Sequence, residues 1–487
     1  MRATARERAE TLIDSQSIGY HYDEEALGFK EPFRQAEMSK NPGRIISSVL
    51  VATGLLAFVV SLAGSPLSGT WTGILLSFGL VSLGTMGYSW FGYKDTTAGI
   101  KHDNIMFSDA MHRGIIGWTL GIFITGFYTI LYWYPEYLDR AIFMVDPLAQ
   151  SLAGQPADQW FLYGFMYTLA ILVFGIRTFM KYRHNRYQQI RTFSVMFFQA
   201  GLAFLIPQYL RKLNEPEFYF TYFWPLKYDY LFPGTVDYLM NSPGVLGTFM
   251  VFWGAMATFI ATPILTYFFG KRWYCSWVCG CGGLAETLGD PWRQLAPKST
   301  MSWKIERLVI FSVLILVLAT TIVLWIASNS GGETFGDRAE LMKQWYGFYI
   351  GGLFSGVIGV GFYPILGNRV WCRFGCPMAA ILGIIQRFFS RFRISTNGAQ
   401  CMSCGNCTTY CEMGIDVRAY AERGENIVRA SCVGCGICSA VCPRGVLKLE
   451  NGTTYADRYP NSDNPANALV DALKNGTRVY GEKDGYV

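Results

Sequence analysis

Cysteine is absent from the first 274 residues of this 487-residue chain, and all thirteen cysteines follow from Cys275 onward. Histidine is also scarce, with four residues in total. The chain has no G-x-G-x-x-G turn after a strand, no P-loop and no nucleophile elbow. These absences exclude the common nucleotide-binding and hydrolase motifs. We therefore expect the chain to catalyse little alone and assign no catalytic residue.

Charged residues are few as well, at 16% of the chain, whereas 51% are hydrophobic and 16% aromatic. This composition is too apolar for an ordinary soluble enzyme. Apolar runs of about 20 residues are long enough to cross a bilayer as helices. The eight such runs are 45–64, 72–92, 114–134, 159–179, 193–210, 246–269, 308–328 and 346–366. A polar, charged stretch of about forty residues precedes the first run, which is not the layout of a cleavable signal peptide, so all eight are expected to remain.

The interiors of these runs contain no Asp, Glu, Lys or His. Ionisable residues inside a membrane usually mark proton or ion pathways, so their lack argues against a pump or an ion-coupled transporter. It also leaves no pair of histidines to ligate a membrane haem. The histidines lie in loops or at the ends of runs, and we expect His102 and His112, near the start of the third run, to be ordinary loop residues.

Basic residues gather after the fourth, sixth and eighth runs, in 181–191, 271–307 and 369–393, whereas the loops after the third and seventh runs are acidic. The positive-inside rule then places the basic loops and both termini in the cytoplasm, at a bacterial inner membrane. All thirteen cysteines fall on this reducing side, which disfavours disulfides. The net charge of +6 is explained by these loops and implies no nucleic-acid partner.

Eight cysteines form two runs of C-x-x-C-x-x-C-x-x-x-C spacing between 401 and 442. In a two-cluster ferredoxin, three thiolates of a run bind one iron–sulfur cube and the fourth binds the other cube. The predicted ligand sets are Cys401, Cys404, Cys407 and Cys442 for cluster 1, and Cys432, Cys435, Cys438 and Cys411 for cluster 2. Zinc is the alternative, but it needs only four ligands and does not explain the duplication. Glu412 stands where such motifs usually have proline.

The other five cysteines belong to an internal repeat. Gly270-Lys-Arg-Trp-Tyr-Cys275-Ser-Trp-Val-Cys279 aligns with Gly367-Asn-Arg-Val-Trp-Cys372-Arg-Phe-Gly-Cys376, and each segment follows an apolar run. A duplicated unit of this kind predicts four thiols near one another at the membrane surface. The second motif continues with Pro377, whereas the first has Gly280 and an additional Cys281.

Several roles are open for these CxxxC cysteines. Cys275, Cys279, Cys372 and Cys376 could bind a third cluster, or Cu(I) with Cys281 and Met378 as further soft donors. They could instead form a redox dithiol, since Lys271, Arg272, Arg369 and Arg373 would lower the pKa of nearby thiols. The remaining alternative is that they are buried side chains without a ligand.

These motifs resemble those of the NosR/NapH/CcoG-like membrane-bound ferredoxins. Members of that family carry two C-x-x-x-C-P motifs at the ends of transmembrane helices, followed by a cytoplasmic double-cluster ferredoxin domain. The resemblance covers roughly residues 246–450. It implies electron transfer between quinols and redox partners, support of other metalloenzymes, or copper reduction. The chain has neither the flavin domain of the NosR branch nor the C-terminal sandwich of the CcoG branch, and the NapH branch leaves four N-terminal runs unexplained.

A quinone site would need an apolar cleft with a few polar groups near a cluster. The candidates to line it are five aromatic residues near the CxxxC motifs: Trp273, Tyr274, Trp277, Trp371 and Phe374. An interfacial aromatic belt explains them too. The aromatic loop 212–245 is broken by prolines and is expected to be an interfacial re-entrant lid or a docking surface for a partner.

The sequence thus predicts an α-helical polytopic membrane protein of about eight transmembrane helices with a small cytoplasmic α+β ferredoxin domain. The expected units are residues 1–43, a cytoplasmic segment; 44–393, the membrane domain; 394–452, the ferredoxin domain; and 453–487, a polar tail. The leading hypothesis is an electron-transfer subunit that relays electrons between the quinone pool, or another donor, and a partner enzyme. A copper-reducing assembly factor and a membrane redox sensor are the alternatives.

Overall fold

The computed structural model describes residues 41–94 and 114–451. The predicted tail at 453–487, nearly all of the N-terminal segment, and His21, His102 and His112 lie outside this part of the chain. Within it the structure is almost wholly helical, with one two-stranded sheet near its C-terminal end.

The first half of the membrane part contains five long helical segments. Asn41 caps the first by accepting a hydrogen bond from the Gly43 amide, and Asp158 caps the fourth through the Phe161 amide. The long segments and their connections are α3 (Pro42–Leu62), α4–η1–α5 (Trp71–Ile74, Leu75–Gly79 and Leu80–Tyr93), α6 (Ile115–Trp133), η3 (Pro135–Leu138), α7 (Asp139–Met144), α8 (Asp146–Ala153), α9 (Gln159–Lys181) and α10–η4–α11 (Arg186–Phe197, Phe198–Leu205 and Ile206–Lys212).

The second half begins with the aromatic loop, which folds back among the helices. Phe218, Phe223 and Tyr230 in it are buried, as the re-entrant prediction requires. The elements of this half are η5 (Tyr228–Leu231), α12 (Pro233–Met240), α13–η6–α14 (Leu246–Met256, Ala257–Ala261 and Thr262–Phe269), α17 (Thr300–Asn329), α18–η8–α19 (Gly336–Trp345, Tyr346–Ile358 and Gly359–Gly361) and α20 (Tyr363–Leu366).

Seven helices in the described ranges are long and apolar enough to cross a membrane, and they coincide with the first seven predicted runs. The eighth run, 346–366, is helical as far as Gly361 but is not among the seven. Six glycines between 347 and 361 dilute its apolar side chains, which accounts for the difference. Passage of this helix through the membrane therefore stays a prediction.

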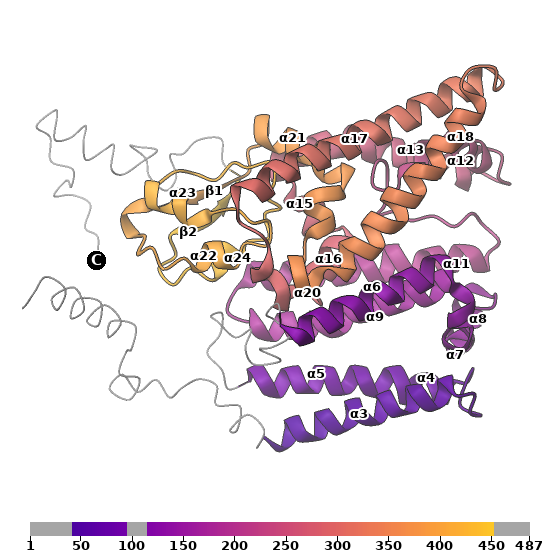
Figure 1. Cartoon of the computed structure of the whole chain (residues 1–487), viewed down its shortest axis with the longest axis horizontal. Coiled ribbons are helices and arrows are strands. Elements are labelled where there is room, and N and C mark those ends of the chain that lie inside the picture. Colours follow the sequence, from indigo (N-terminus) through magenta and orange to yellow (C-terminus); the bar gives the residue numbers. More distant parts are fainter. Residues whose placement is uncertain (1–40, 95–113, 452–487) are drawn as a thin grey trace, which may run out of the picture.

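The helices form an elongated bundle with the cysteine-rich domain at one end (Figure 1). The α3–α5 hairpin lies along one side of the bundle and packs on α9. The other side contains α17 and the α18–η8 segment, which run next to each other. Short helices join the bundle to the cysteine-rich domain: α15 (Arg272–Cys275), α16 (Gly280–Glu286), η7 (Asp290–Leu295), η9 (Trp371–Gly375) and α21 (Pro377–Phe388).

The cysteine-rich domain is built on two antiparallel strands, β1 (Arg393–Thr396) and β2 (Leu447–Glu450), with Arg393 opposite Glu450. Between the strands lie η10 (Gly398–Gln400), α22 (Asn406–Thr409), α23 (Val417–Arg423) and α24 (Ile437–Ala440). One apolar core runs from this domain into the membrane part and includes Leu382, Phe392 and Met413. The two parts are therefore packed as one body at this end.

Candidate metal centres

The first predicted ligand set lies at the outer end of the cysteine-rich domain. Cys401, Cys404, Cys407 and Cys442 all line one small cavity. Gly405 has a left-handed backbone conformation, with φ +76°, and caps the start of α22. The chain therefore turns between Cys404 and Cys407. Cys404 is exposed, so this group reaches the surface.

The second ligand set lies deeper, against the membrane part. Gly436, also at φ +76°, begins α24 as Gly405 begins α22, so the two sequence runs share a backbone plan. Burial raises the pKa of Cys432 to about 12, and the nearby Cys411 adds to this. Cys438 neighbours both of these thiols. The structure thus brings Cys411, Cys432 and Cys438 together, while the Cys435 thiol lies within 4.8 Å of two carboxylates, Glu286 and Glu412.

The spacing of the thiols is wide. In the described ranges, which contain every cysteine, no three thiols lie within 4.8 Å of one another. Tetrahedral zinc with Zn–S bonds of about 2.3 Å would hold its sulfurs roughly 3.8 Å apart. An iron–sulfur cube, which binds each thiolate at a different corner, needs the wider spacing. The part of the chain that the structure describes therefore contains no compact tetrahedral group of thiols.

The CxxxC repeat has matching backbone geometry in both copies. Gly270 (φ +66°, ψ −173°) ends α14, and Gly367 (φ +91°, ψ 171°) ends α20. Only glycine adopts this region readily. Nine residues later, Cys279 and Cys376 occupy the N-cap positions of α16 and α21. The Cys376 sulfur accepts a hydrogen bond from the Ala379 amide at 3.4 Å.

The four CxxxC thiols come together in the interior. All four cysteines are buried, and the Cys376 thiol is electrostatically influenced by Cys372, Cys275 and Cys279. Burial raises the pKa of Cys275 to about 12, more than Lys271 lowers it, and burial likewise raises the pKa of Cys372. Lys271 and Arg369 lower the pKa of these thiols as expected, but burial outweighs them, so the redox-dithiol hypothesis gains no support from the structure.

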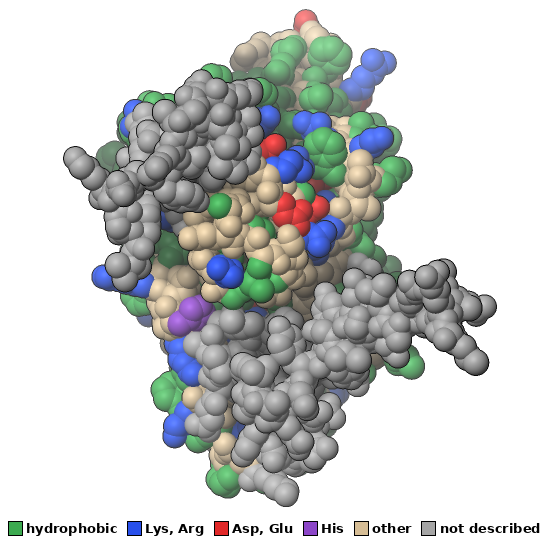
Figure 2. Space-filling model, turned by 90° about the vertical axis from the view of Figure 1, so that its left-hand side faces the viewer, with side chains coloured by type: hydrophobic (Ala, Val, Ile, Leu, Met, Phe, Trp, Pro, Cys, Tyr) green, Lys and Arg blue, Asp and Glu red, His purple; other side chains and the backbone are tan. Residues whose placement is uncertain are grey.

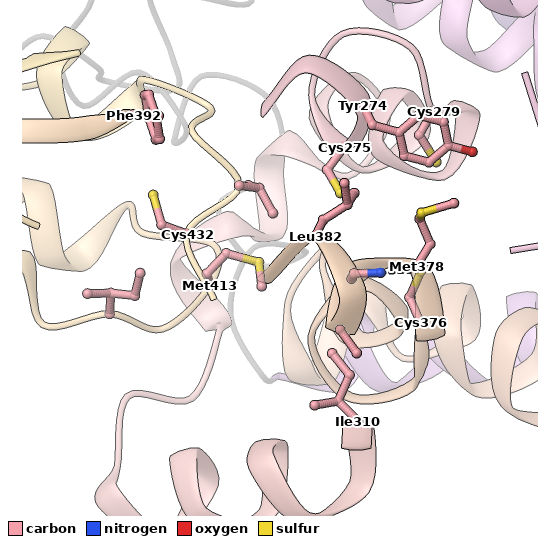
Figure 3. Close-up of a cluster of buried hydrophobic side chains, with 14 of the residues drawn as sticks. Tyr274, Cys275, Cys279, Ile310, Cys376, Met378, Leu382, Phe392, Met413 and Cys432 are labelled. Atoms are coloured by element: carbon pink, nitrogen blue, oxygen red, sulfur yellow. Dashed lines mark hydrogen bonds between the residues drawn. The ribbon is translucent and has the colours of Figure 1, made fainter. Parts of the chain in front are cut away.

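Apolar side chains fill the space between the CxxxC thiols and the second ligand set. Figure 3 shows Met413 and Leu382 between Cys432 on one side and Cys275 and Cys376 on the other. All of them belong to the same buried core. The half-buried Cys281 packs at the edge of this core, and Met378 is buried within it.

A buried ionic network lies beside the same thiols. In the described residues, five cationic side chains contact three carboxylates of this network. The cations are Arg177, Lys181, Arg191, Arg293 and Arg369, and the carboxylates are Glu286, Asp290 and Glu412.

Two arginines connect this network to sulfur. Arg369 donates to Glu286 at 2.6 Å and to the Cys372 sulfur at 3.6 Å. Arg293 donates to Glu412 and lies 3.9 Å from the Cys435 sulfur. The network therefore joins the CxxxC thiols to the second ligand set.

The pKa values of two carboxylates in the network shift in opposite directions. Burial alone would raise the pKa of Glu286, but Arg191, Arg293 and Arg369 hold it well below its ordinary range. Burial raises the pKa of Glu412, and Arg293 and Arg369 only partly offset this. The group of Glu286, Glu412 and Cys435 is not a metal site of its own, because arginines already occupy both carboxylates.

The loop that carries Cys432 and Cys435 is held on the membrane part through its backbone. Six of its carbonyls accept hydrogen bonds of 2.7–3.3 Å from side chains of α10, α15, α21 and their flanking residues. The acceptors are the carbonyls of Arg429, Ala430, Cys432, Val433, Gly434 and Cys435, and the donors are Gln386, Lys271, Ser276, Tyr187 and Gln188. The second ligand set is therefore fixed against the bundle.

Sequence reasoning missed the network. Arg293 and Arg369 were counted as charges of cytoplasmic loops, yet both are fully buried. The replacement of the usual proline by Glu412 was visible, and it was the signal that could have pointed to buried cations.

Comparisons with known proteins agree with this arrangement. Residues 400–447 match the model of a 4Fe-4S dicluster domain, and residues 251–299 and 349–395 each match the model of a 4Fe-4S binding domain. The paired match confirms the internal repeat, with one CxxxC motif in each copy. Iron–sulfur clusters are therefore supported as the cofactors.

Relatives are distant. The chain is 23% identical over 157 residues to the electron transport protein YccM of Escherichia coli, a match that covers 30% of this chain and 43% of the relative. It is 26% identical over 164 residues to the methylamine utilization ferredoxin-type protein MauN of Methylobacillus flagellatus, covering 32% of this chain and 55% of the relative. The chain thus spans about half the length of these relatives. No solved structure matches it.

Proposed function

We propose that the protein is a membrane-anchored electron-transfer protein that relays electrons between the quinone pool and a partner redox enzyme. One observation carries the proposal: three groups of thiols follow one another from the interior of the helical part to the exposed Cys404. The order is the CxxxC group, the Cys411–Cys432–Cys438 group and the Cys401–Cys442 group.

The residues present fit cubes in all three groups. Cys401, Cys404, Cys407 and Cys442 would hold cluster 1, and Cys432, Cys435, Cys438 and Cys411 would hold cluster 2. Cys275, Cys279, Cys372 and Cys376 would hold a third. A bound [4Fe–4S] cube supplies a site that accepts and releases one electron. Amide donors to sulfur at Ala379 and Ile415, and the guanidinium groups of Arg369 and Arg293 near the Cys372 and Cys435 sulfurs, would stabilise the negative charge of thiolate-bound cubes.

The apolar helices provide the link to a lipid-soluble carrier. Oxidation of a quinol to a quinone releases two electrons and two protons, and two one-electron centres would take the electrons in turn. The exposed end at Cys404 is the exit toward a soluble or membrane-bound partner enzyme. Transfer in the opposite direction uses the same groups.

Copper handling is the second candidate, favoured by the position of Cys281. Its thiol lies close enough to Cys279 to raise the pKa of that thiol, and Met378 lies in the same core. These would be soft donors for Cu(I). A redox sensor would use the same clusters without a quinone.

Iron and acid-labile sulfide counting on the purified protein tests the proposal. We expect about twelve iron atoms per chain, falling to about eight in the double variant Cys372→Ser/Cys376→Ser. The ferredoxin signals in electron paramagnetic resonance should remain in that variant. About eight iron atoms in the unaltered protein, with stoichiometric copper that Cys372→Ser removes, would replace the third cluster with the copper hypothesis.

A further inference from the structure

A cavity of about 680 Å³ opens among the helices and reaches the neighbours of the CxxxC cysteines. Its walls come from α9, η4, η8 and the aromatic loop. At one end it reaches Cys281, Trp371 and Pro377, the residue after Cys376. A molecule in this cavity would therefore touch the surroundings of the CxxxC thiols.

Ten of the 24 residues that line the cavity are aromatic. Tyr132, Tyr163, Tyr167, Tyr222 and Trp371 contribute to its walls. Flat rings suit a flat, ring-shaped ligand, because they provide large apolar contacts at low entropic cost. Of the five aromatic residues that the sequence proposed for a quinone site, the cavity includes Trp371. The rings of Trp277 and Tyr274 instead contact Tyr187 and Phe223.

Two polar atoms in the wall lack partners. Gln199 and Gln208 are about 95% buried, and the Oε1 atom of each accepts no hydrogen bond. Gln199 donates through Nε2 to Thr168 Oγ1 at 3.0 Å, which leaves its oxygen as the free atom. A methyl group added at Gly280 would lie 2.3 Å from that oxygen and 2.2 Å from Tyr222 Oη. The Gln199 oxygen and the Tyr222 hydroxyl therefore both lie beside Gly280, the residue between Cys279 and Cys281 in the sequence.

Buried acceptors without partners call for a ligand that donates hydrogen bonds. The wall also contains Asp158, Glu217, Asp229 and Lys227, of which Asp158 is paired with Arg211. The two neutral amide oxygens themselves do not suit an anion. A flat aromatic ring with hydroxyl groups satisfies both the oxygens and the walls. We infer that the cavity binds the head group of a quinol, with Gln199 and Gln208 accepting hydrogen bonds from its hydroxyls. This inference rests on the proposed quinone-linked function and locates its membrane substrate.

The test uses the full-length protein in lipid nanodiscs and 2-heptyl-4-hydroxyquinoline N-oxide, a quinol analogue, with binding followed by quenching of the analogue's fluorescence. We expect saturable binding by the unaltered protein. Gln199→Leu and Gln208→Leu should each weaken binding about fivefold, the effect of one lost hydrogen bond. Gln150→Leu, the same change on the exposed surface of α8, should leave it unchanged. Equal iron content in all four proteins shows that each is folded.

Binding that is absent, or equal in the unaltered protein and both cavity variants, overturns the inference. Reduction of the clusters by a quinol, measured separately by electron paramagnetic resonance, distinguishes this failure from that of the proposed function. Binding that follows the expected pattern without cluster reduction supports the cavity assignment. It contradicts the proposal that a quinol supplies electrons to the clusters. Reduction of the clusters by a quinol without analogue binding at Gln199 and Gln208 supports the function and rejects the cavity.

Discussion

At the scale of single residues, Arg293 lies at the centre of the buried ionic network. Its guanidinium is fully buried and contacts three carboxylates, those of Glu286, Asp290 and Glu412. Charges buried in this way are stable only when they are paired, and removing one partner costs about 3–5 kcal/mol. Arg293 also lies 3.9 Å from the Cys435 sulfur, so the network contacts the second ligand set.

Asp290 gives this network a pH dependence. Burial would raise its pKa, but Lys181, Arg293 and Arg177 together hold the pKa below its ordinary range. A lowered pKa in the folded state contributes stability above the ordinary Asp pKa of about 4, and that stability is lost as the pH falls below it. Asp290→Asn should therefore lower the free energy of unfolding by about 3–5 kcal/mol at pH 7, with a difference that shrinks below about pH 4.

Thermal unfolding followed by tryptophan fluorescence between pH 7 and pH 3 measures this difference. Loss of iron in acid affects both proteins alike, so the comparison isolates the carboxylate. Asp237→Asn, at an exposed aspartate, is the control and should track the unaltered protein at every pH. A deficit in Asp290→Asn that stays constant down to pH 3 would contradict the prediction.

Some residues of the candidate site could be predicted from the sequence, and others could not. The spacing of the eight ferredoxin cysteines predicts two ligand sets, because a cube fixes local spacing. The structure places Cys401, Cys404, Cys407 and Cys442 around one cavity, and the complete ligand sets stay a prediction. The network escaped prediction because its members are far apart in the chain: Arg177 pairs with Asp290, and Arg293 pairs with Glu412. Charge patterns along a sequence indicate topology, but they do not show which charges will be buried together.

At the scale of elements, the two CxxxC units repeat a short plan of helix end, glycine, thiol and helix start. Gly367 packs against the backbone of Ala296, where a methyl group would lie 2.8 Å from the amide nitrogen. Gly270 is equally confined by Gln386 and Phe392. These contacts hold each motif in place relative to its neighbours, so we expect glycine at both positions to be required for the thiols to meet.

Gly367→Ala tests this requirement. Its φ of +91° imposes backbone strain of about 1–3 kcal/mol on any other residue, and the clash with Ala296 adds to this cost. Gly331→Ala, at φ +64° with nothing within 4 Å, incurs the strain alone. We expect a larger fall in the unfolding midpoint and loss of iron from the CxxxC group only in Gly367→Ala. Equal behaviour of the two variants would show that the contact with Ala296 does not matter.

Hydropathy located the long helices well, because each of the first seven runs became a helix of membrane-spanning length. It did not predict the π-helical turns within them, such as Phe198–Leu205, which shift the register of side chains locally. Nor could it predict that the aromatic loop packs against Tyr274, whose hydroxyl donates to the Thr221 carbonyl at 2.7 Å. Such contacts depend on how helices meet rather than on any single run.

At the scale of the whole molecule, exposure of the thiols increases away from the helical part. The CxxxC cysteines are buried, whereas Cys404 is exposed and its neighbour Met402 is 57% exposed. On the end of the molecule that carries the cysteine-rich domain, acidic and basic side chains stand in small separate groups (Figure 2). The part of this face that the structure describes therefore presents mixed charge to a partner.

This gradient predicts the order in which the clusters are lost. Ferricyanide should attack cluster 1 first, because its ligands reach the surface, and cluster 2 more slowly, because its loop is held on the bundle. Stopped-flow absorbance should show two phases whose rates differ by about tenfold or more. Cys407→Ser should remove the fast phase and Cys435→Ser the slow one. Loss of both clusters in a single phase would contradict the gradient.

The six backbone carbonyls that hold the cysteine-rich domain on the bundle also constrain how the protein is made. Once that contact has formed, the CxxxC thiols are enclosed, and no assembly factor can reach them without opening it. An inorganic guest of these thiols would then have to arrive before the domain closes over them or pass through the cavity that reaches Cys281. The exposed Cys404, in contrast, stays accessible in the finished protein.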